Sequence, residues 1–294
     1  MKTIYQLLVG GFLISHSVFA QSGWKSRPLP YQNMGRLSAT AIQADDTLRF
    51  SWKEYSAGGL TNILMATVYL APGDMDKLAQ AIQYPANSSE QTKAELAYLI
   101  HLQKNRTQAD YDRSLFLANI GYWPGQLNPT DANYAQNQKD LLYELTAVFD
   151  STFSGRKLPQ TARLLHNIMR DVRAAEFQLK YHFRRPRPYH LSEAVKPYNR
   201  MGSPAFPSGH TLWAFANAYL LSELVPDKRT ILTELAEEIR WSREVLGIHY
   251  PSDNEAARKT AGQMLVFWKQ NPKFRADLAK AKAEIAAKRA VAER

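Results

Sequence analysis

Three short segments of the chain hold residue types whose chemistry suits an anionic substrate. The first, Lys180–Pro188, contains one lysine and three arginines. A basic run at the end of a helix mostly offsets the helix dipole and faces solvent. The same cations can also clamp an oxyanion, since the planar fork of arginine matches two phosphate oxygens. This segment therefore supplies candidate ligands for phosphate.

The second segment is Phe206–Thr211, which leads into an apolar run. Its proline and serine are typical of a helix start. Gly209 would let a ligand approach the backbone, and the free amides of a helix N-terminus form an anion site. His210 stands beside that position, where an imidazole can donate a proton. The segment predicts an anion site with a general acid.

The third segment runs from Ser242 to Asp253. Gly247 is typical of a helix end and Pro251 of a helix start, which places His249 in a tight corner between two helices. A single histidine in such a corner is more often structural than catalytic. Asp253, however, follows four residues later and can accept the Nδ1 proton, turning Nε2 outward. A neutral imidazole held in this way is suited to nucleophilic attack.

Taken together, the segments resemble the motif of one family, K-x6-RP, PSGH and SR-x5-H-x3-D. The matching residues are Lys180, Arg187, Pro188, Pro207, Ser208, Gly209, His210, Ser242, Arg243, His249 and Asp253. The family is the type 2 phosphatidic acid phosphatase superfamily, which includes bacterial class A acid phosphatases and vanadium haloperoxidases. The chain looks most like the soluble class A acid phosphatases.

The resemblance implies a role for each matched side chain. His249 would attack phosphorus and form a phosphohistidine, and Asp253 would orient it. His210 would protonate the leaving alkoxide and then activate water. The phosphate oxygens would be bound by Lys180, Arg187, Arg243, Ser208 and the amide of Gly209. No cofactor is expected, because cations and amides would offset the charge of the transition state; vanadate would bind as a phosphate mimic.

Helical periodicity dominates the chain from about residue 60, and no strand-like alternation is sustained. The class expected is all-α, a single helical-bundle domain of the type found in this superfamily. Helices are predicted at about 74–82, 89–104, 108–120, 131–150, 161–183, 209–224, 228–246, 252–270 and 273–292. Residues 186–206 are expected to form a loop with at most one short helical turn.

The first twenty residues have the pattern of a secretory signal peptide, with one lysine, an apolar run and a small-residue site after Ala20. Cleavage there predicts a periplasmic or secreted protein. The division expected is a signal peptide at 1–20, an extended arm at 21–58, a catalytic domain at 59–271 and a basic C-terminal helix at 272–294. No later run is long enough to insert in a membrane.

The chain contains no cysteine, which excludes disulfides, thiolate metal sites and cysteine nucleophiles. No cluster of acidic residues and histidines has the spacing of a metal site. The formal net charge of +10 suits an anionic substrate. Part of that charge lies in residues 273–294, which look like a solvated helix with one apolar face rather than a nucleic-acid surface. The partners expected are small phosphorylated substrates, without specific nucleic acid; a homo-oligomer is left open.

These features favour an exported, metal-independent phosphatase acting on phosphate monoesters. Two other enzymes share the expected anion ligands. A vanadium-dependent haloperoxidase would hold vanadate as its cofactor in the same site, and a lipid phosphatase would act at a membrane. A basic binding surface without catalysis is the remaining alternative.

Overall fold

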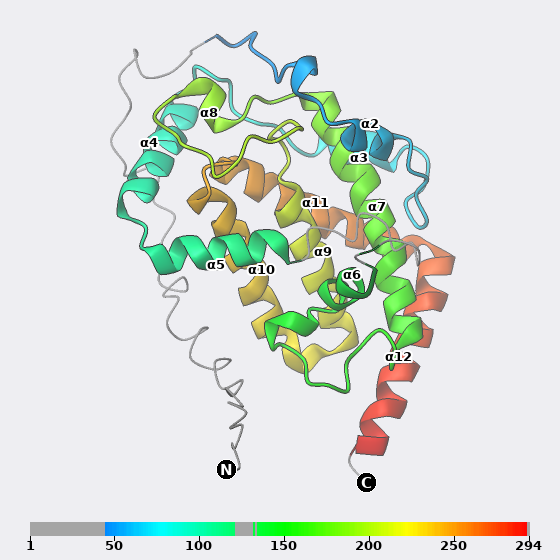
Figure 1. Ribbon diagram of the computed structural model, residues 1–294. Coiled ribbons are helices and arrows are strands. Elements are labelled where there is room, and N and C mark those ends of the chain that lie inside the picture. The colour runs from blue at the N-terminus through cyan, green and yellow to red at the C-terminus, as the bar shows by residue number, and fades with distance from the viewer. Residues whose placement is uncertain (1–44, 121–131, 133, 293–294) are drawn as a thin grey trace, which may run out of the picture.

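The computed structural model describes residues 45–120, 132 and 134–292, and within these residues it contains helices and no strand (Figure 1). The all-α class is therefore confirmed. The α-helices are α2 (Ala57–Ile63), α3 (Asp74–Gln80), α4 (Glu90–Asn105), α5 (Gln108–Asn119), α6 (Tyr134–Leu141), α7 (Pro159–Phe183), α8 (Pro188–Leu191), α9 (Gly209–Leu224), α10 (Arg229–Val245), α11 (Pro251–Gln270) and α12 (Pro272–Ala292).

Most helix ends lie where local signals predict them. Ser89 caps α4 by accepting a hydrogen bond from the amide of Thr92. Gly247 follows α10 with a φ of 68°, a left-handed conformation that glycine adopts without strain, and α11 begins at Pro251. The loop between α7 and α9 contains only the short helix α8.

The prediction of one helix over 131–150 is wrong in its length. α6 ends at Leu141 and is followed by a single 3-10 turn, Glu144–Thr146. The two residues that flank this turn, Tyr143 and Ala147, have φ values of 55° and 58° and cannot continue a right-handed helix. Tyr143 is instead buried in the core, where its hydroxyl donates to the carbonyl of Ala214.

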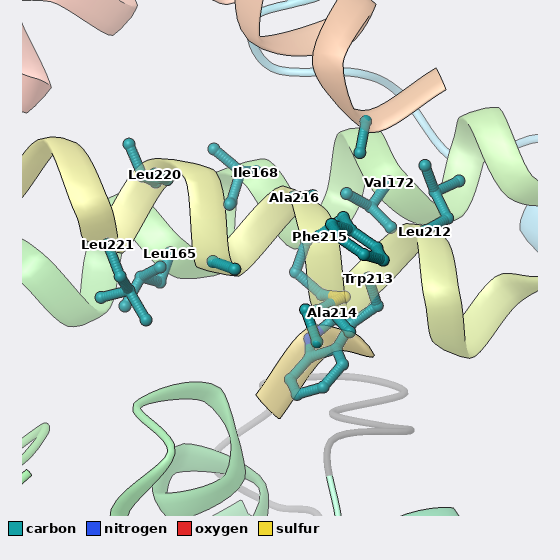
Figure 2. Close-up of a cluster of buried hydrophobic side chains, with 14 of the residues drawn as sticks. Leu165, Ile168, Val172, Leu212, Trp213, Ala214, Phe215, Ala216, Leu220 and Leu221 are labelled. Atoms are coloured by element: carbon teal, nitrogen blue, oxygen red, sulfur yellow. The ribbon is translucent and has the colours of Figure 1, made fainter. Parts of the chain in front are cut away.

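The helix α9 runs through the centre of the molecule and packs against α10, α11 and α7. Its side chains are buried on nearly every face, as its apolar sequence requires. Figure 2 shows Leu165, Ile168 and Val172 of α7 next to the side chains of α9. Since α9 is fixed on several sides, its N-terminus is held firmly against α7.

The C-terminal helix α12 lies along α7 (Figure 1). Its buried face carries Phe274, Ala281 and Ile285, three members of the main core. The apolar face expected for this basic helix is therefore the one that packs on the domain.

The predicted signal peptide and most of the predicted arm lie outside the described residues. Residues 45–58 of the arm contain a 3-10 turn, Trp52–Glu54, and the start of α2. The amide of Phe50 donates to the carbonyl of Arg184, and the amide of Ser56 donates to the carbonyl of Gly202. This part of the chain thus lies against the loop that follows α7. Among the described residues, no helix has the length and apolar character needed to cross a bilayer.

Asp171, which is fully buried in α7, ties three segments together. It accepts hydrogen bonds from the amides of Val68, Tyr69 and Leu70, and from the indole of Trp268 on α11. Replacing Asp171 with alanine would leave these donors buried without an acceptor. We expect a loss of about 3 kcal/mol or more in the free energy of unfolding, measured by urea denaturation.

The matched control is Asp76→Ala on α3, because Asp76 is exposed. That change should cost less than about 1 kcal/mol, the size of a helix-dipole interaction. Equal losses in the two variants would show that the Asp171 bonds do not hold the segment of Val68–Leu70 in place.

Candidate active site

A cavity of about 210 Å³ lies where the three sequence segments meet. Five of the predicted site residues line it, namely Lys180, Arg187, Gly209, His210 and His249. They come from the end of α7, the loop before α8, the first turn of α9 and the corner between α10 and α11. The remaining three, Ser208, Arg243 and Asp253, are buried and do not line the cavity.

His249 is held by a carboxylate on one side and a guanidinium on the other. Its Nδ1 lies 3.0 Å from Oδ2 of Asp253, and its Nε2 lies 2.8 Å from Nη1 of Arg187. An arginine only donates and a carboxylate only accepts, so Nδ1 carries the hydrogen and Nε2 has the free electron pair. The geometry directs Nε2 of His249 toward the cavity wall that carries the cation.

The surroundings keep this histidine neutral. Burial, with Arg187 beside it, lowers the pKa of His249 well below its ordinary value, although Asp253 acts in the opposite direction. Burial would raise the pKa of Asp253, but Arg185 and His249 outweigh it and lower that pKa to about 2. An ionised aspartate thus orients an imidazole whose surroundings favour its neutral form.

The carboxylate of Asp253 is itself held by a second buried network. Its Oδ1 accepts a 2.6 Å hydrogen bond from Nη1 of Arg185, whose guanidinium lies 3.8 Å above the ring of Tyr250. Nη2 of Arg185 lies 3.2 Å from Oε2 of Glu95, and Glu95 also accepts hydrogen bonds from the amide and the hydroxyl of Ser252. Arg185 and Glu95 therefore act on His249 through Asp253 and do not line the cavity.

The ammonium group of Lys180 donates to backbone carbonyls of the loop before α9. Its Nζ lies 2.8 Å from the oxygen of Pro204 and 2.7 Å from that of Pro207. Burial and the nearby Arg187 lower the pKa of Lys180 to about 7, against an upward effect of Glu176. The charge of this lysine therefore depends on pH near neutrality.

Arg187 is anchored along its whole guanidinium. Nε donates to the carbonyl of Ser203, Nη1 to that of Ile248 and Nη2 to the hydroxyl of Ser203. The loop carbonyls thus fix the planar fork at the cavity. The arginine needs no rearrangement of the backbone to face an anion there.

His210 lies in the first turn of α9, with Nε2 3.1 Å from the carbonyl of Ala118. Because a carbonyl only accepts, Nε2 carries a hydrogen, and Nδ1 is the nitrogen that gains or loses a proton. Burial and the neighbouring Arg243 lower the pKa of His210 well below its ordinary value. A bound anion would oppose this effect and favour the protonated ring.

Arg243 and Ser208 lie behind the cavity wall. Nη2 of Arg243 donates to the hydroxyl of Ser242 at 2.7 Å and to the carbonyl of Ser114 at 3.3 Å. Ser208 donates its hydroxyl to Thr211. The guanidinium of Arg243 therefore acts on the cavity through its charge, which lowers the pKa of His210.

Sequence reasoning missed Glu176, which lines the cavity, as well as Arg185 and Glu95. Glu176 lies one turn before Lys180, and Arg173 lies one turn before Glu176, all on a helix whose other buried face is apolar. Polar residues at helical spacing on a buried face are a usable signal, because buried charges need partners. Arg185 was noted only as a member of the basic run, and only its contacts distinguish it.

Among residues 45–120, 132 and 134–292, no group of three His, Asp or Glu side chains is arranged to hold a metal ion. The cations and imidazoles that line the cavity are Lys180, Arg187, His210 and His249, beside one carboxylate, Glu176. Such a set suits an oxyanion better than a divalent cation.

The chain is similar in sequence to known proteins. Residues 163–275 match the sequence profile of the PAP2 superfamily. The non-specific acid phosphatase of Providencia stuartii is 28% identical over 185 residues, which cover 61% of this chain and 73% of that protein. The non-specific acid phosphatase of Salmonella typhi is 28% identical over 164 residues, covering 51% of this chain and 65% of that protein, just under two thirds of its length.

A solved structure supports the fold. The crystal structure of a bacterial vanadium-dependent iodoperoxidase superposes with a TM-score of 0.50 and 18% sequence identity, covering 82% of this chain and 63% of that one. The matched profile spans all three segments that form the cavity. Residues 163–275, which contain these three segments, are therefore similar to the PAP2 superfamily.

Proposed function

We propose that this protein is a phosphatase that hydrolyses phosphate monoesters through a phosphohistidine at His249. The observation that carries the proposal is the tautomer of His249, with Nδ1 bonded to ionised Asp253 and Nε2 facing Arg187 in the cavity. A nucleophile of this kind needs a free electron pair next to a cation that binds the electrophile. The acid phosphatases similar to this chain support the same reaction.

In the proposed first step, Nε2 of His249 forms a bond to phosphorus as the bond from phosphorus to the leaving oxygen breaks. His210 gives its proton to that oxygen, so the product leaves as an alcohol. In the second step, His210 takes a proton from water, whose oxygen attacks phosphorus and breaks the N–P bond. Inorganic phosphate is released and both histidines return to their starting states.

Lys180, Arg187 and the first turn of α9 stabilise the phosphoryl oxygens during both steps. Fixed cations and backbone amides that need no reorientation stabilise transition-state charge more than water does. Arg243 contributes its charge from behind His210 and Ser208 shapes the start of α9. No metal ion or organic cofactor has a role in this scheme.

We further propose that the protein is exported, on the strength of the signal-peptide pattern in residues 1–20. A periplasmic or secreted phosphatase would act on small phosphorylated compounds outside the cytoplasm. Mass spectrometry of the mature N-terminus after expression with an intact leader tests this, with cleavage after Ala20 expected and an uncleaved chain contradicting it.

The assay that tests the function measures hydrolysis of p-nitrophenyl phosphate in the presence of EDTA, with orthovanadate as inhibitor. Turnover should survive the chelator and stop with vanadate, which mimics phosphate. A parallel assay with added vanadate, bromide or iodide and hydrogen peroxide measures haloperoxidase activity. Peroxidase turnover without phosphatase turnover would overturn the proposal, as would activity lost in EDTA and restored by zinc or magnesium.

The pH dependence of kcat/KM follows from the two groups that must carry a proton. The pKa of Lys180 is about 7, so its charge is lost as pH rises through neutrality, whereas His210, whose pKa lies well below its ordinary value, loses its charge at lower pH. The lowered pKa of His249 favours the neutral form of its ring. We expect kcat/KM for p-nitrophenyl phosphate to fall about tenfold or more between pH 5 and pH 8.

Lys180→Arg provides the control for this profile, since arginine keeps its charge across the range. Any alkaline decline that depends on Lys180 should move to higher pH in this variant. A wild-type profile that rises steadily to pH 9 would contradict the assigned protonation states.

A further inference from the structure

The cavity contains a carboxylate as well as its cations. Glu176 of α7 lines it and is only 3% exposed. The charged and titratable side chains around it are Arg173, Lys180 and Tyr181 of its own helix, His210 of α9, and Arg187, Tyr198 and His249 from the loops. A negative charge inside a site for an anion weakens binding unless it makes a specific interaction with the ligand. The presence of Glu176 therefore calls for a chemical explanation.

The two oxygens of Glu176 have different surroundings. Oε2 accepts a 3.2 Å hydrogen bond from Nη1 of Arg173, which anchors this oxygen. Oε1 is turned toward Gly209, so closely that a β-carbon added to this glycine would lie 1.9 Å from it. Gly209 is thus required by the approach of a carboxylate oxygen, at the helix N-terminus where a phosphate oxygen is expected to bind.

An ionised carboxylate accepts hydrogen bonds and has none to donate. A phosphoryl group with a P–OH has a donor for it, whereas a fully deprotonated one does not. The second pKa of a phosphate monoester is near 6, so below that pH most of the substrate carries this hydrogen. Sulfate and sulfate esters have the same tetrahedral shape but no such hydrogen at these pH values.

From this geometry, we propose that Glu176 is a specificity-determining residue that selects the protonated, singly charged form of a phosphate monoester. Its Oε1 accepts the P–OH hydrogen beside Gly209, while Lys180 and Arg187 bind the charged oxygens. A dianionic phosphate or a sulfate would place a charged oxygen against Oε1, with no hydrogen between them. The inference rests on the proposed function, which identifies a phosphate monoester as the ligand of the cavity. It adds that the site binds the singly charged form of that ester and rejects anions of the same shape that lack a hydrogen.

The test uses direct binding of inorganic phosphate and of sulfate, measured by isothermal titration calorimetry at pH 5. For the wild-type protein we expect sulfate to bind at least about tenfold more weakly than phosphate, the scale set by one unmatched buried polar group. Glu176→Gln keeps the shape but loses the charge and offers an NH2 donor. This variant should bind sulfate about tenfold more tightly than wild type and reduce the preference for phosphate correspondingly.

Glu193→Gln is the matched control, because Glu193 is exposed in the loop after α8 and does not line the cavity. It should leave both affinities within about twofold of wild type, as expected of an exposed side chain away from the site. An unchanged phosphate-to-sulfate ratio in Glu176→Gln, with the fold intact by circular dichroism, would overturn the inference. Equal binding of the two anions by the wild-type protein would also overturn it.

A second measurement on the wild-type protein covers the case in which Glu176→Gln does not fold. Sulfate keeps its charge between pH 5 and pH 8, so its binding reports the titration of Lys180 and the histidines alone. The ratio of phosphate to sulfate affinity should therefore fall about tenfold over this range as phosphate loses its hydrogen. A ratio independent of pH would contradict the role of Glu176.

These outcomes are separable from those of the proposed function. Selective phosphate binding without hydrolysis of p-nitrophenyl phosphate would contradict the proposed phosphatase activity and support the role of Glu176. Hydrolysis of p-nitrophenyl phosphate with no preference for phosphate over sulfate would support the phosphatase activity and contradict the role of Glu176.

Discussion

Replacing His249 with alanine is expected to lower kcat for p-nitrophenyl phosphate by about four orders of magnitude or more. The change removes the nitrogen that would form the bond to phosphorus. His210, the other imidazole of the cavity, has its Nε2 directed at the carbonyl of Ala118, and in the proposed mechanism its proton goes to the leaving group. Neither histidine can take over the role of the other. Steady-state kinetics at pH 5 measures the loss.

His101→Ala is the control for this change, because His101 is exposed on α4. Its kcat should stay within about twofold of wild type, as is usual for a surface substitution. Rapid acid-free quenching with a labelled substrate should trap phosphohistidine in the wild type and none in His249→Ala. If His249→Ala keeps more than about a hundredth of the wild-type kcat, the loss is no larger than removal of a general acid or base produces, and another group is the nucleophile.

The helices that position the site were predictable because local signals mark their ends. α9 begins at Gly209 after a serine and ends at Leu224, and α11 begins at Pro251, as the sequence indicates. Proline at a first turn, glycine after a last turn and an apolar period act within a few residues of chain. The corner that holds His249 is defined by two such signals, so its position close to Asp253 was predictable too.

The turn after α6 depends on distant parts of the chain. Residues 141–150 have helical periodicity, yet the ring of Tyr143 is drawn into the core against Trp213, at 5.2 Å between ring centroids. Tyr143 adopts a left-handed conformation to reach this place. Tertiary packing outweighs local preference here because a buried aromatic ring contributes more than helix propensity does.

The motif identifies the site residues but does not show where their side chains point. Lys180, Arg187, His210 and His249 meet at one cavity as the resemblance implies, whereas the guanidinium of Arg243 is directed to Ser242 and Ser114. Contacts that join residues far apart in the chain, such as Arg185 with Glu95, leave no periodic trace in a single sequence. The contact of the Glu176 carboxylate with Gly209 likewise could not be predicted from the sequence, because it depends on how α7 packs against α9.

Arg187→Ala is expected to lower kcat/KM by about a hundredfold or more, the second largest effect we anticipate. The guanidinium lines the cavity, contacts Nε2 of His249 and is held by three hydrogen bonds to the loops. In the proposed mechanism, its removal takes away a charge that stabilises the phosphoryl oxygens in the transition state. Lysine should restore little of the activity, because an ammonium group cannot reproduce the planar fork.

Arg184→Ala is the sharpest control for this prediction, since Arg184 belongs to the same basic run and ends α7 in a left-handed conformation. Its guanidinium donates to the carbonyl of Phe50 and lies 4.4 Å above the ring of Trp52, away from the residues that line the cavity. Loss of such a contact should change kcat/KM by less than about tenfold, as a cation–π pair near the surface contributes about 0.5–1 kcal/mol. If Arg184→Ala is as damaging as Arg187→Ala while its circular dichroism spectrum and melting temperature match wild type, the phosphate ligand in this run has been assigned to the wrong arginine.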